Sequence, residues 1–321
     1  MKKILSLLFI SFMMINVSFL TSCSSQGSIT KEDSTVYIPD TSKIQIVNKS
    51  WVEIKKKVIL ITGSASGFGK ASAKKLIAKG HIVYGADINA KGNQYLVKIG
   101  GTPLQMDVRK NAQVLAGVAR IIKEQGRIDV LVNNAGYGEY GLIETMKIKD
   151  LINQFNVNVF GYARLQQAVL PYMRKQRSGR IILVSSGLGK FSMQVLGWYA
   201  ATKHAVEGMA DALRIEVHKF NIDVVKIQPG ASNTNFVKTA YARLDQSYIP
   251  EDYKKMVAAF RKSLDGLMAK AGGPDETANA IVEAVETAKP KISYVTMPDA
   301  KFFIQKRKKE SEEEFYKMFM K

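Results

Sequence analysis

Three side chains near the middle of the chain have the types and spacing that proton transfer requires. Tyr199 and Lys203 are four residues apart, so on a helix they lie one turn apart on the same face. A free tyrosine has a pKa near ~10, and a neighbouring ammonium group stabilises the phenolate and lowers that pKa. Ser186 ends the preceding apolar segment and can hydrogen-bond an alcohol or carbonyl oxygen at the same point. This set predicts acid–base interconversion of an alcohol and a ketone.

Taken alone, the Tyr-x-x-x-Lys spacing is also typical of an amphipathic helix with a buried tyrosine and an exposed lysine. A second signal upstream favours the catalytic interpretation. The segment 62–69, Thr-Gly-Ser-Ala-Ser-Gly-Phe-Gly, lies between an apolar strand and a helix. Glycines there let the backbone approach a pyrophosphate, and the helix N-terminus stabilises its negative charge. We therefore expect a dinucleotide at this turn.

Asp87 ends the second expected strand and indicates which dinucleotide binds. A carboxylate at this position accepts hydrogen bonds from the adenosine ribose hydroxyls and repels a 2′-phosphate. No arginine follows it in residues 88–90, so the sequence predicts NAD in preference to NADP, although Lys70 and Lys91 are nearby. The alternative is that Asp87 is a solvated loop residue.

Apolar strands alternate with helices from residue 55 to residue 297. We expect strands at 57–62, 81–86, 102–106, 128–132, 180–185, 222–228 and 291–296, and helices at 70–79, 111–125, 151–176, 197–220 and 274–288. This alternation predicts a single α/β domain with a three-layer, doubly wound Rossmann fold and a parallel sheet. Residues 231–271 carry no strand pattern and are expected to form one or two helices as a substrate flap.

The combined motifs resemble the short-chain dehydrogenase/reductase family over about residues 55–295. The matching segments are the glycine turn at 62–69, Asp107-Val108, Asn133-Asn-Ala-Gly136, Asn158 in Asn-Val-Phe-Gly, Ser186, Tyr199-x-x-x-Lys203, and Pro229-Gly230 with Thr234. Phe68 departs from the family pattern, which has an aliphatic residue there.

The resemblance implies a role for each matching residue. The implied catalytic residues are Asn158, Ser186, Tyr199 and Lys203, with Asn158 holding a water. The implied cofactor contacts are Gly63, Ser66, Gly67, Phe68, Gly69, Asp87, Asp107, Val108, Asn134, Tyr199, Lys203 and Thr234. Family members commonly pair through their long helices, so a homodimer or homotetramer is expected. No metal site is expected.

The N-terminal segment has the pattern of a bacterial lipoprotein leader. A basic start, an apolar run to Leu20 and Leu-Thr-Ser-Cys ending at Cys23 predict a signal peptide at 1–22 and a lipidated Cys23. Residues 23–54 are then a polar tether, and the enzyme is a membrane-anchored lipoprotein on the extracytoplasmic side. The alternatives are an uncleaved membrane helix or a leader that does not function, which would leave the enzyme in the cytoplasm.

The formal net charge is +19, and the pI is about 9.7. Because no recognition module accompanies the charge, we expect a solvated surface with some affinity for anionic membranes and no nucleic-acid partner. Residues 298–321 form a charged C-terminal tail, basic and then acidic.

Aromatic residues in the flap bear on the substrate. They indicate an apolar steroid-, retinoid- or lipid-like alcohol or ketone, although they could equally serve only to pack the flap on the sheet. The expected activity is NAD(P)-dependent interconversion of an alcohol and its carbonyl. A membrane-anchored nucleotide-binding protein of the same fold, without turnover, is the second hypothesis.

Overall fold

The computed structural model describes residues 38–320 except 43, 45–49, 52 and 246. The predicted signal peptide, Cys23 and most of the predicted tether lie outside these residues. No helix in the described part of the chain combines the length and apolarity that a membrane span requires.

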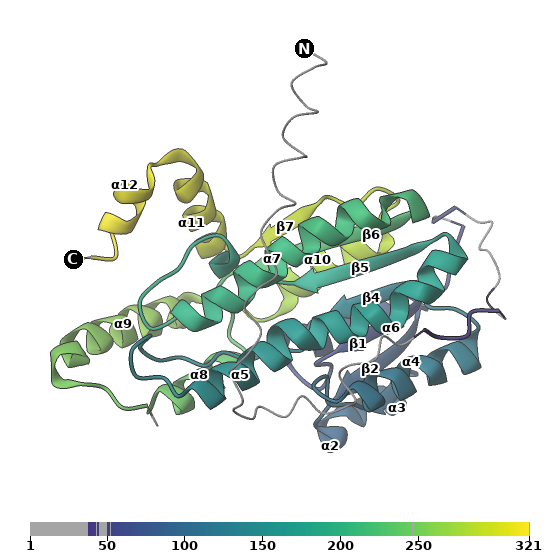
Figure 1. Ribbon diagram of the computed structural model, residues 1–321, viewed down its shortest axis with the longest axis horizontal. Coiled ribbons are helices and arrows are strands. Elements are labelled where there is room, and N and C mark those ends of the chain that lie inside the picture. Colours follow the sequence, from purple (N-terminus) through teal and green to yellow (C-terminus); the bar gives the residue numbers. More distant parts are fainter. Residues whose placement is uncertain (1–37, 43, 45–49, 52, 246, 321) are drawn as a thin grey trace, which may run out of the picture. The chain divides into compact units, whose positions relative to one another are not determined.

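Seven parallel strands form one sheet, as the sequence predicted (Figure 1). They are β1 (Val58–Thr62), β2 (Ile82–Asp87), β3 (Thr102–Gln105), β4 (Val130–Asn133), β5 (Gly179–Val184), β6 (Ile222–Pro229) and β7 (Ser293–Thr296). Their spatial order is β3-β2-β1-β4-β5-β6-β7, and every pairing is parallel. The three-layer Rossmann prediction is therefore confirmed.

Helices cover both faces of the sheet because its strands are apolar on both sides. One face packs against α4 (Asn111–Gln125), α6 (Gly161–Gln176) and α7 (Gly197–Val217), and the other packs against α1 (Gly67–Ala78), α3 (Tyr95–Lys98) and α10 (Asp275–Glu286). A short helix α2 (Ala90–Asn93) follows β2. The strand order reverses between β1 and β4, so ligands are expected at the carboxyl ends of these strands.

The predicted helix at 151–176 is longer and less regular in the structure. It consists of α5 (Ile148–Phe155), a π-helical turn η2 (Asn156–Phe160) and α6, with Pro171 inside α6. π-turns are rare and occur frequently at functional sites. Here the turn contains Asn158, one of the predicted catalytic residues.

Part of the segment ahead of β1 packs onto the domain. Ile44 and Ile54 are buried, and the Trp51 ring lies 4.1 Å from the Arg180 guanidinium. The Trp51 indole also donates a hydrogen bond to the Val285 carbonyl (3.0 Å). The folded unit therefore includes residues before position 55.

Two helices, α8 (Asn235–Asp245) and α9 (Glu251–Lys270), form most of the segment 231–271. Beyond β7, α11 (Pro298–Lys309) and α12 (Glu312–Lys317) form a helical pair (Figure 1). The fully buried Phe315 packs with Ile304 and with Phe191, which follows β5. The charged C-terminal segment thus contributes an apolar cluster of its own.

Candidate active site

Ser186 and Tyr199 come together at the carboxyl edge of the sheet. Ser186 follows β5, and its hydroxyl lies close enough to the Tyr199 phenol to act on the pKa of that phenol. The same hydroxyl accepts from the Leu188 N–H (3.2 Å) and donates to the Pro229 carbonyl (3.4 Å). Tyr199 comes from a different element, the first turn of α7.

Lys203 lies one turn further along α7 and is buried. Its ammonium group donates to the Val184 carbonyl (2.8 Å) and lies 5.7 Å from the Tyr199 ring centroid. Burial lowers the pKa of Lys203 to about 8, and the carboxylate of Glu207 opposes that shift. Lys203 therefore remains mostly cationic at neutral pH.

Apolar side chains cover the Tyr199 phenol. The Phe236 ring, from α8, lies 5.3 Å from the Tyr199 ring, and the Tyr140 ring lies at 6.4 Å. Burial raises the pKa of Tyr199 well above its ordinary value, and the hydrogen bond to Ser186 opposes the rise. The pKa of Tyr199 is thus raised and not lowered as the sequence predicted, because burial dominates, and the phenol keeps its proton at neutral pH.

Asn158 is fully buried in the π-turn and braces the segment after β4. Its side-chain oxygen accepts from the Tyr137 N–H (3.0 Å), and its amide donates to the Tyr137 carbonyl (2.8 Å) and to the Thr202 hydroxyl (3.2 Å). Thr202 adjoins Lys203, so Asn158 fixes α7 relative to β4. Its role in holding a water stays a prediction.

The glycine turn has the close packing that pyrophosphate binding requires. A Cβ on Gly69 would lie 2.3 Å from the Gly63 carbonyl oxygen, and Gly63 has a φ of +67°. Asn134 supports the turn by donating its amide to the Thr62 and Gly63 carbonyls (2.8 and 3.3 Å). Ser66 precedes α1 without bonding its side chain to the helix terminus. These residues fit a pyrophosphate against the α1 N-terminus.

Other predicted cofactor residues surround this turn. A Cβ on Gly67 would lie 3.8 Å from Thr234, which places Thr234 across from the α1 terminus. Phe68 packs partly buried against the core, and Val108 is buried against Gly161. Asp87, at the end of β2, accepts from the Ala65 N–H (2.9 Å) and the Asn89 N–H (2.8 Å).

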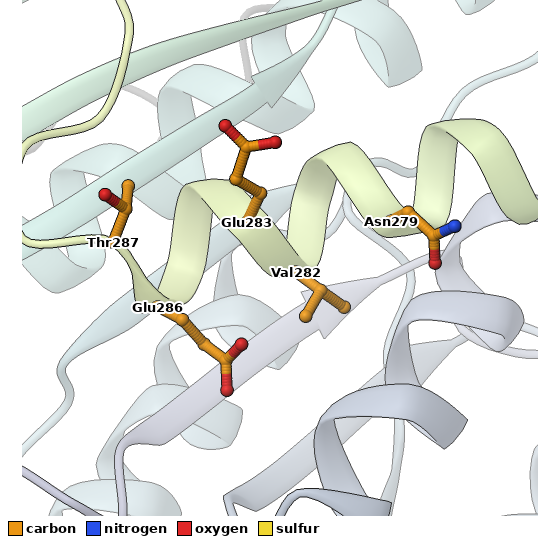
Figure 2. A pocket seen from close by; sticks show the side chains of 5 residues that line it. All are labelled: Asn279, Val282, Glu283, Glu286 and Thr287. Atoms are coloured by element: carbon orange, nitrogen blue, oxygen red, sulfur yellow. The ribbon is translucent and has the colours of Figure 1, made fainter.

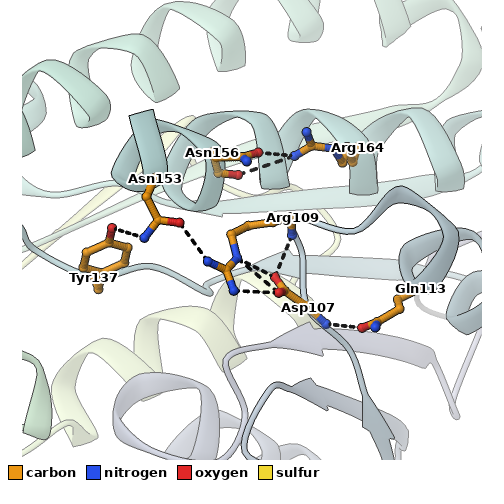
Figure 3. A network of polar contacts seen from close by, with 7 residues as sticks. All are labelled: Asp107, Arg109, Gln113, Tyr137, Asn153, Asn156 and Arg164. Carbon is orange, nitrogen blue, oxygen red and sulfur yellow. Dashed lines mark hydrogen bonds and ion pairs between the residues drawn. The ribbon is translucent and has the colours of Figure 1, made fainter. Parts of the chain in front are cut away.

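A polar network that the sequence did not predict joins Asp107 to Tyr137 (Figure 3). Arg109 binds the Asp107 carboxylate (Nη2–Oδ2, 2.7 Å) and donates to Asn153 (2.8 Å), whose amide donates to the Tyr137 hydroxyl (2.7 Å). The hydrogen bonds from Arg109 lower the pKa of Asp107. The Arg243 guanidinium of α8 lies 4.5 Å from the centre of the Tyr137 ring. The presence of Arg109 two residues beyond Asp107 could have indicated this network from the sequence.

A shallow depression on α10 lies apart from this site (Figure 2). Its lining residues are Asn279, Val282, Glu283, Glu286 and Thr287. Glu286 pairs with Lys79 (2.9 Å), and Glu283 lies 3.7 Å from Lys291. Since α10 and α7 pack on opposite faces of the sheet, this depression does not involve Tyr199.

The family profile described as short chain dehydrogenase matches residues 57–245. The chain belongs to this family. It is accordingly an oxidoreductase that acts on CH–OH or carbonyl groups with a nicotinamide cofactor.

Two proteins that this short-chain dehydrogenase resembles are named as reductases. It is 45% identical over 183 residues to the 3-ketodihydrosphingosine reductase of Bacteroides thetaiotaomicron, an alignment that covers 57% of this chain and 66%, just under two thirds, of that protein. It is 35% identical over 254 residues to the NADPH-dependent 3-dehydrocapnine reductase of Ornithobacterium rhinotracheale, covering 76% and 89%. A Burkholderia phymatum short chain dehydrogenase/reductase solved with NAD superposes with a TM-score of 0.69 at 25% identity, covering 79% and 93%.

Proposed function

We propose that the enzyme reduces the keto group of a long-chain lipid, using Tyr199 as proton donor. The contact between Phe236 and Tyr199 is the observation that carries this proposal, because it places an apolar flap directly over the proton donor. Leu188, Met193 and Tyr241 belong to the same cluster around the flap. An apolar chain entering beneath α8 would replace these contacts with its own. The names of the two relatives support a keto-lipid substrate.

Each side chain of the site has a separate role in the reduction. The nicotinamide cofactor, when bound, supplies the hydride. Ser186 holds the substrate carbonyl oxygen, and Tyr199 donates the proton that this oxygen takes up. Burial raises the pKa of Tyr199, so the phenol is protonated at neutral pH and has a proton to give to the substrate oxygen. Lys203 stabilises the phenolate that remains.

The substrate class can be tested with the purified protein, NADH and 3-ketodihydrosphingosine, following absorbance at 340 nm. We expect kcat/KM for this ketone to exceed that for acetoacetate by at least ~100-fold. Each buried methylene contributes about 0.8 kcal/mol, so four of them account for this ratio. Equal or better turnover of acetoacetate would show that the flap does not select an apolar chain.

We propose further that the enzyme prefers NAD(H), because Asp87 ends β2, where a carboxylate can accept hydrogen bonds from an adenosine ribose. Hydrogen bonds from Ala65 and Asn89 fix its carboxylate, which would repel a 2′-phosphate. Asp87→Ser should raise the ratio of NADPH to NADH in kcat/KM by at least about tenfold, equivalent to 1.4 kcal/mol. Asp252→Ser, an exposed change on α9, is the matched control. A wild type that already favours NADPH would refute the preference.

A further inference from the structure

Glu207 is a buried carboxylate on α7, one turn beyond Lys203. Only 4% of its surface is exposed. Its carboxylate binds Lys190 (2.7 Å), lies 3.3 Å from the Lys226 ammonium, and accepts from the Gln228 amide with both oxygens (2.9 and 3.0 Å). Buried charges persist only when they are paired in this way. Burial acts to raise the pKa of Glu207, but the hydrogen bonds lower it below its ordinary value, so the group is ionised at neutral pH.

The partners of Glu207 lie on the two segments that hold Ser186. Lys190 ends the 3-10 turn η3 (Gly187–Gly189), which begins directly after Ser186. Gln228 precedes Pro229, whose carbonyl accepts the hydrogen bond from Ser186. Glu207 therefore connects α7 to both segments at once.

The turn lies directly against α7 at this point. A Cβ on Gly189 would be 2.9 Å from Glu207 Cγ and 3.1 Å from the Lys203 carbonyl oxygen. Only a glycine fits between the turn and the helix. The 3-10 turn η3 therefore packs on α7 between Lys203 and Glu207.

Glu207 is also the carboxylate that acts on Lys203. Burial lowers the pKa of Lys203, and Glu207 raises it. Two cations pair with Glu207. Lys190 comes from the end of η3, and Lys226 comes from β6 and also pairs with Asp211 (2.5 Å). The net negative charge felt by Lys203 therefore depends on how fully Lys190 and Lys226 neutralise Glu207.

We propose that Glu207 is a positioning residue for the reaction: it fixes Ser186 opposite Tyr199 and places a carboxylate one helical turn from Lys203. This rests on the catalytic roles assigned above to Ser186, Tyr199 and Lys203. Glu207 itself does not contact the reacting atoms.

The direct test measures the protonation of Lys203 in cofactor-free protein. Lysine labelled with ¹³C at Cε is titrated by NMR, and Lys203→Met assigns the signal. The wild-type pKa is expected near 8. Glu207→Gln removes a negative charge and should shift the titration to lower pH. Lys190→Met leaves Glu207 less neutralised and should shift it to higher pH.

Kinetics test the positioning role with 3-ketodihydrosphingosine and NADH. Glu207→Gln should lower kcat by up to ~100-fold, because a misplacement of about 1 Å costs on that order. The high-pH decline of kcat should move to lower pH in Glu207→Gln and to higher pH in Lys190→Met. Lys190 is 35% exposed, so its replacement is expected to fold even if Glu207→Gln does not.

Opposite shifts for the two variants would support the proposal. An unmoved Lys203 titration, or shifts of the same sign, would overturn it. A lowered kcat with an unchanged pH profile would mean that Glu207 is structural only, which also contradicts the proposal. If Tyr199→Phe keeps wild-type turnover, the catalytic assignment fails instead, so the two failures are distinguishable.

Discussion

Replacing Tyr199 with phenylalanine is expected to lower kcat by about 10²–10⁴-fold, the range that general acid–base catalysis contributes. The change removes one oxygen and keeps the ring, which packs against Phe236 and Tyr140. The packing of the flap on this ring should therefore be retained. NADH affinity, measured by fluorescence titration, should stay within about twofold, a difference of less than 1 kcal/mol.

Tyr84→Phe is the matched control for this variant. Tyr84 lies in β2 and donates its hydroxyl to Glu124 (2.6 Å), away from Ser186 and Lys203. The same loss of an oxygen there should leave kcat unchanged. Wild-type kcat in Tyr199→Phe would remove the phenol from the mechanism and leave Ser186 as the remaining candidate donor.

Replacing Gly69 with alanine is expected to prevent normal cofactor binding. The added methyl group would lie 2.3 Å from the Gly63 carbonyl oxygen and 2.7 Å from the Asn134 amide nitrogen. The first atom belongs to the glycine turn and the second to the side chain that supports it, so the turn must move. We expect the Kd for NADH to rise at least tenfold, about 1.4 kcal/mol, and the free energy of unfolding to fall by about 1–3 kcal/mol.

Gly266→Ala controls for the change of residue type. Gly266 lies inside α9, and a Cβ there would contact nothing within 4 Å. Alanine stabilises a helix interior by about 1 kcal/mol relative to glycine, so a small gain in stability and an unchanged Kd are expected. Fluorescence titration and thermal melts distinguish the two variants. An unaltered Kd in Gly69→Ala would place the cofactor elsewhere.

The sheet could be predicted from sequence because its strands are apolar on both faces. The runs that end at Thr62 and Asn133 are buried along their length, and the run that ends at Pro229 is buried except at Asp223. Ser186 and Tyr199 could be paired because Ser186 follows the end of β5 and Tyr199 lies at the start of the next long helix. The raised pKa of Tyr199 could not be foreseen, since it comes from burial, and one of the side chains that cover the ring, Phe236, is 37 residues further along the chain.

Long-range polar contacts explain what sequence reasoning missed at the site. Glu207 looks like one charge among many on an amphipathic helix, and only the fold brings Lys190 and Gln228 to it. The π-turn around Asn158 has no periodicity signal of its own. Both features depend on packing between segments that are distant in the chain.

The C-terminal helices had local signals that the charge pattern obscured. Pro298 is the first residue of α11, a position that proline favours. Ser311 and Glu314 form a capping box at the start of α12. What could not be read from the sequence is the burial of Phe315 against Phe191, which converts a charged segment into a packed helical pair.

The stacking of Trp51 on Arg180 holds the segment ahead of β1 far from the catalytic residues. Arg180 lies at the start of β5, a strand of six residues, and Ser186 follows the other end, about 20 Å away at about 3.3 Å per residue. The incoming polypeptide is therefore clamped on the rim opposite the chemistry.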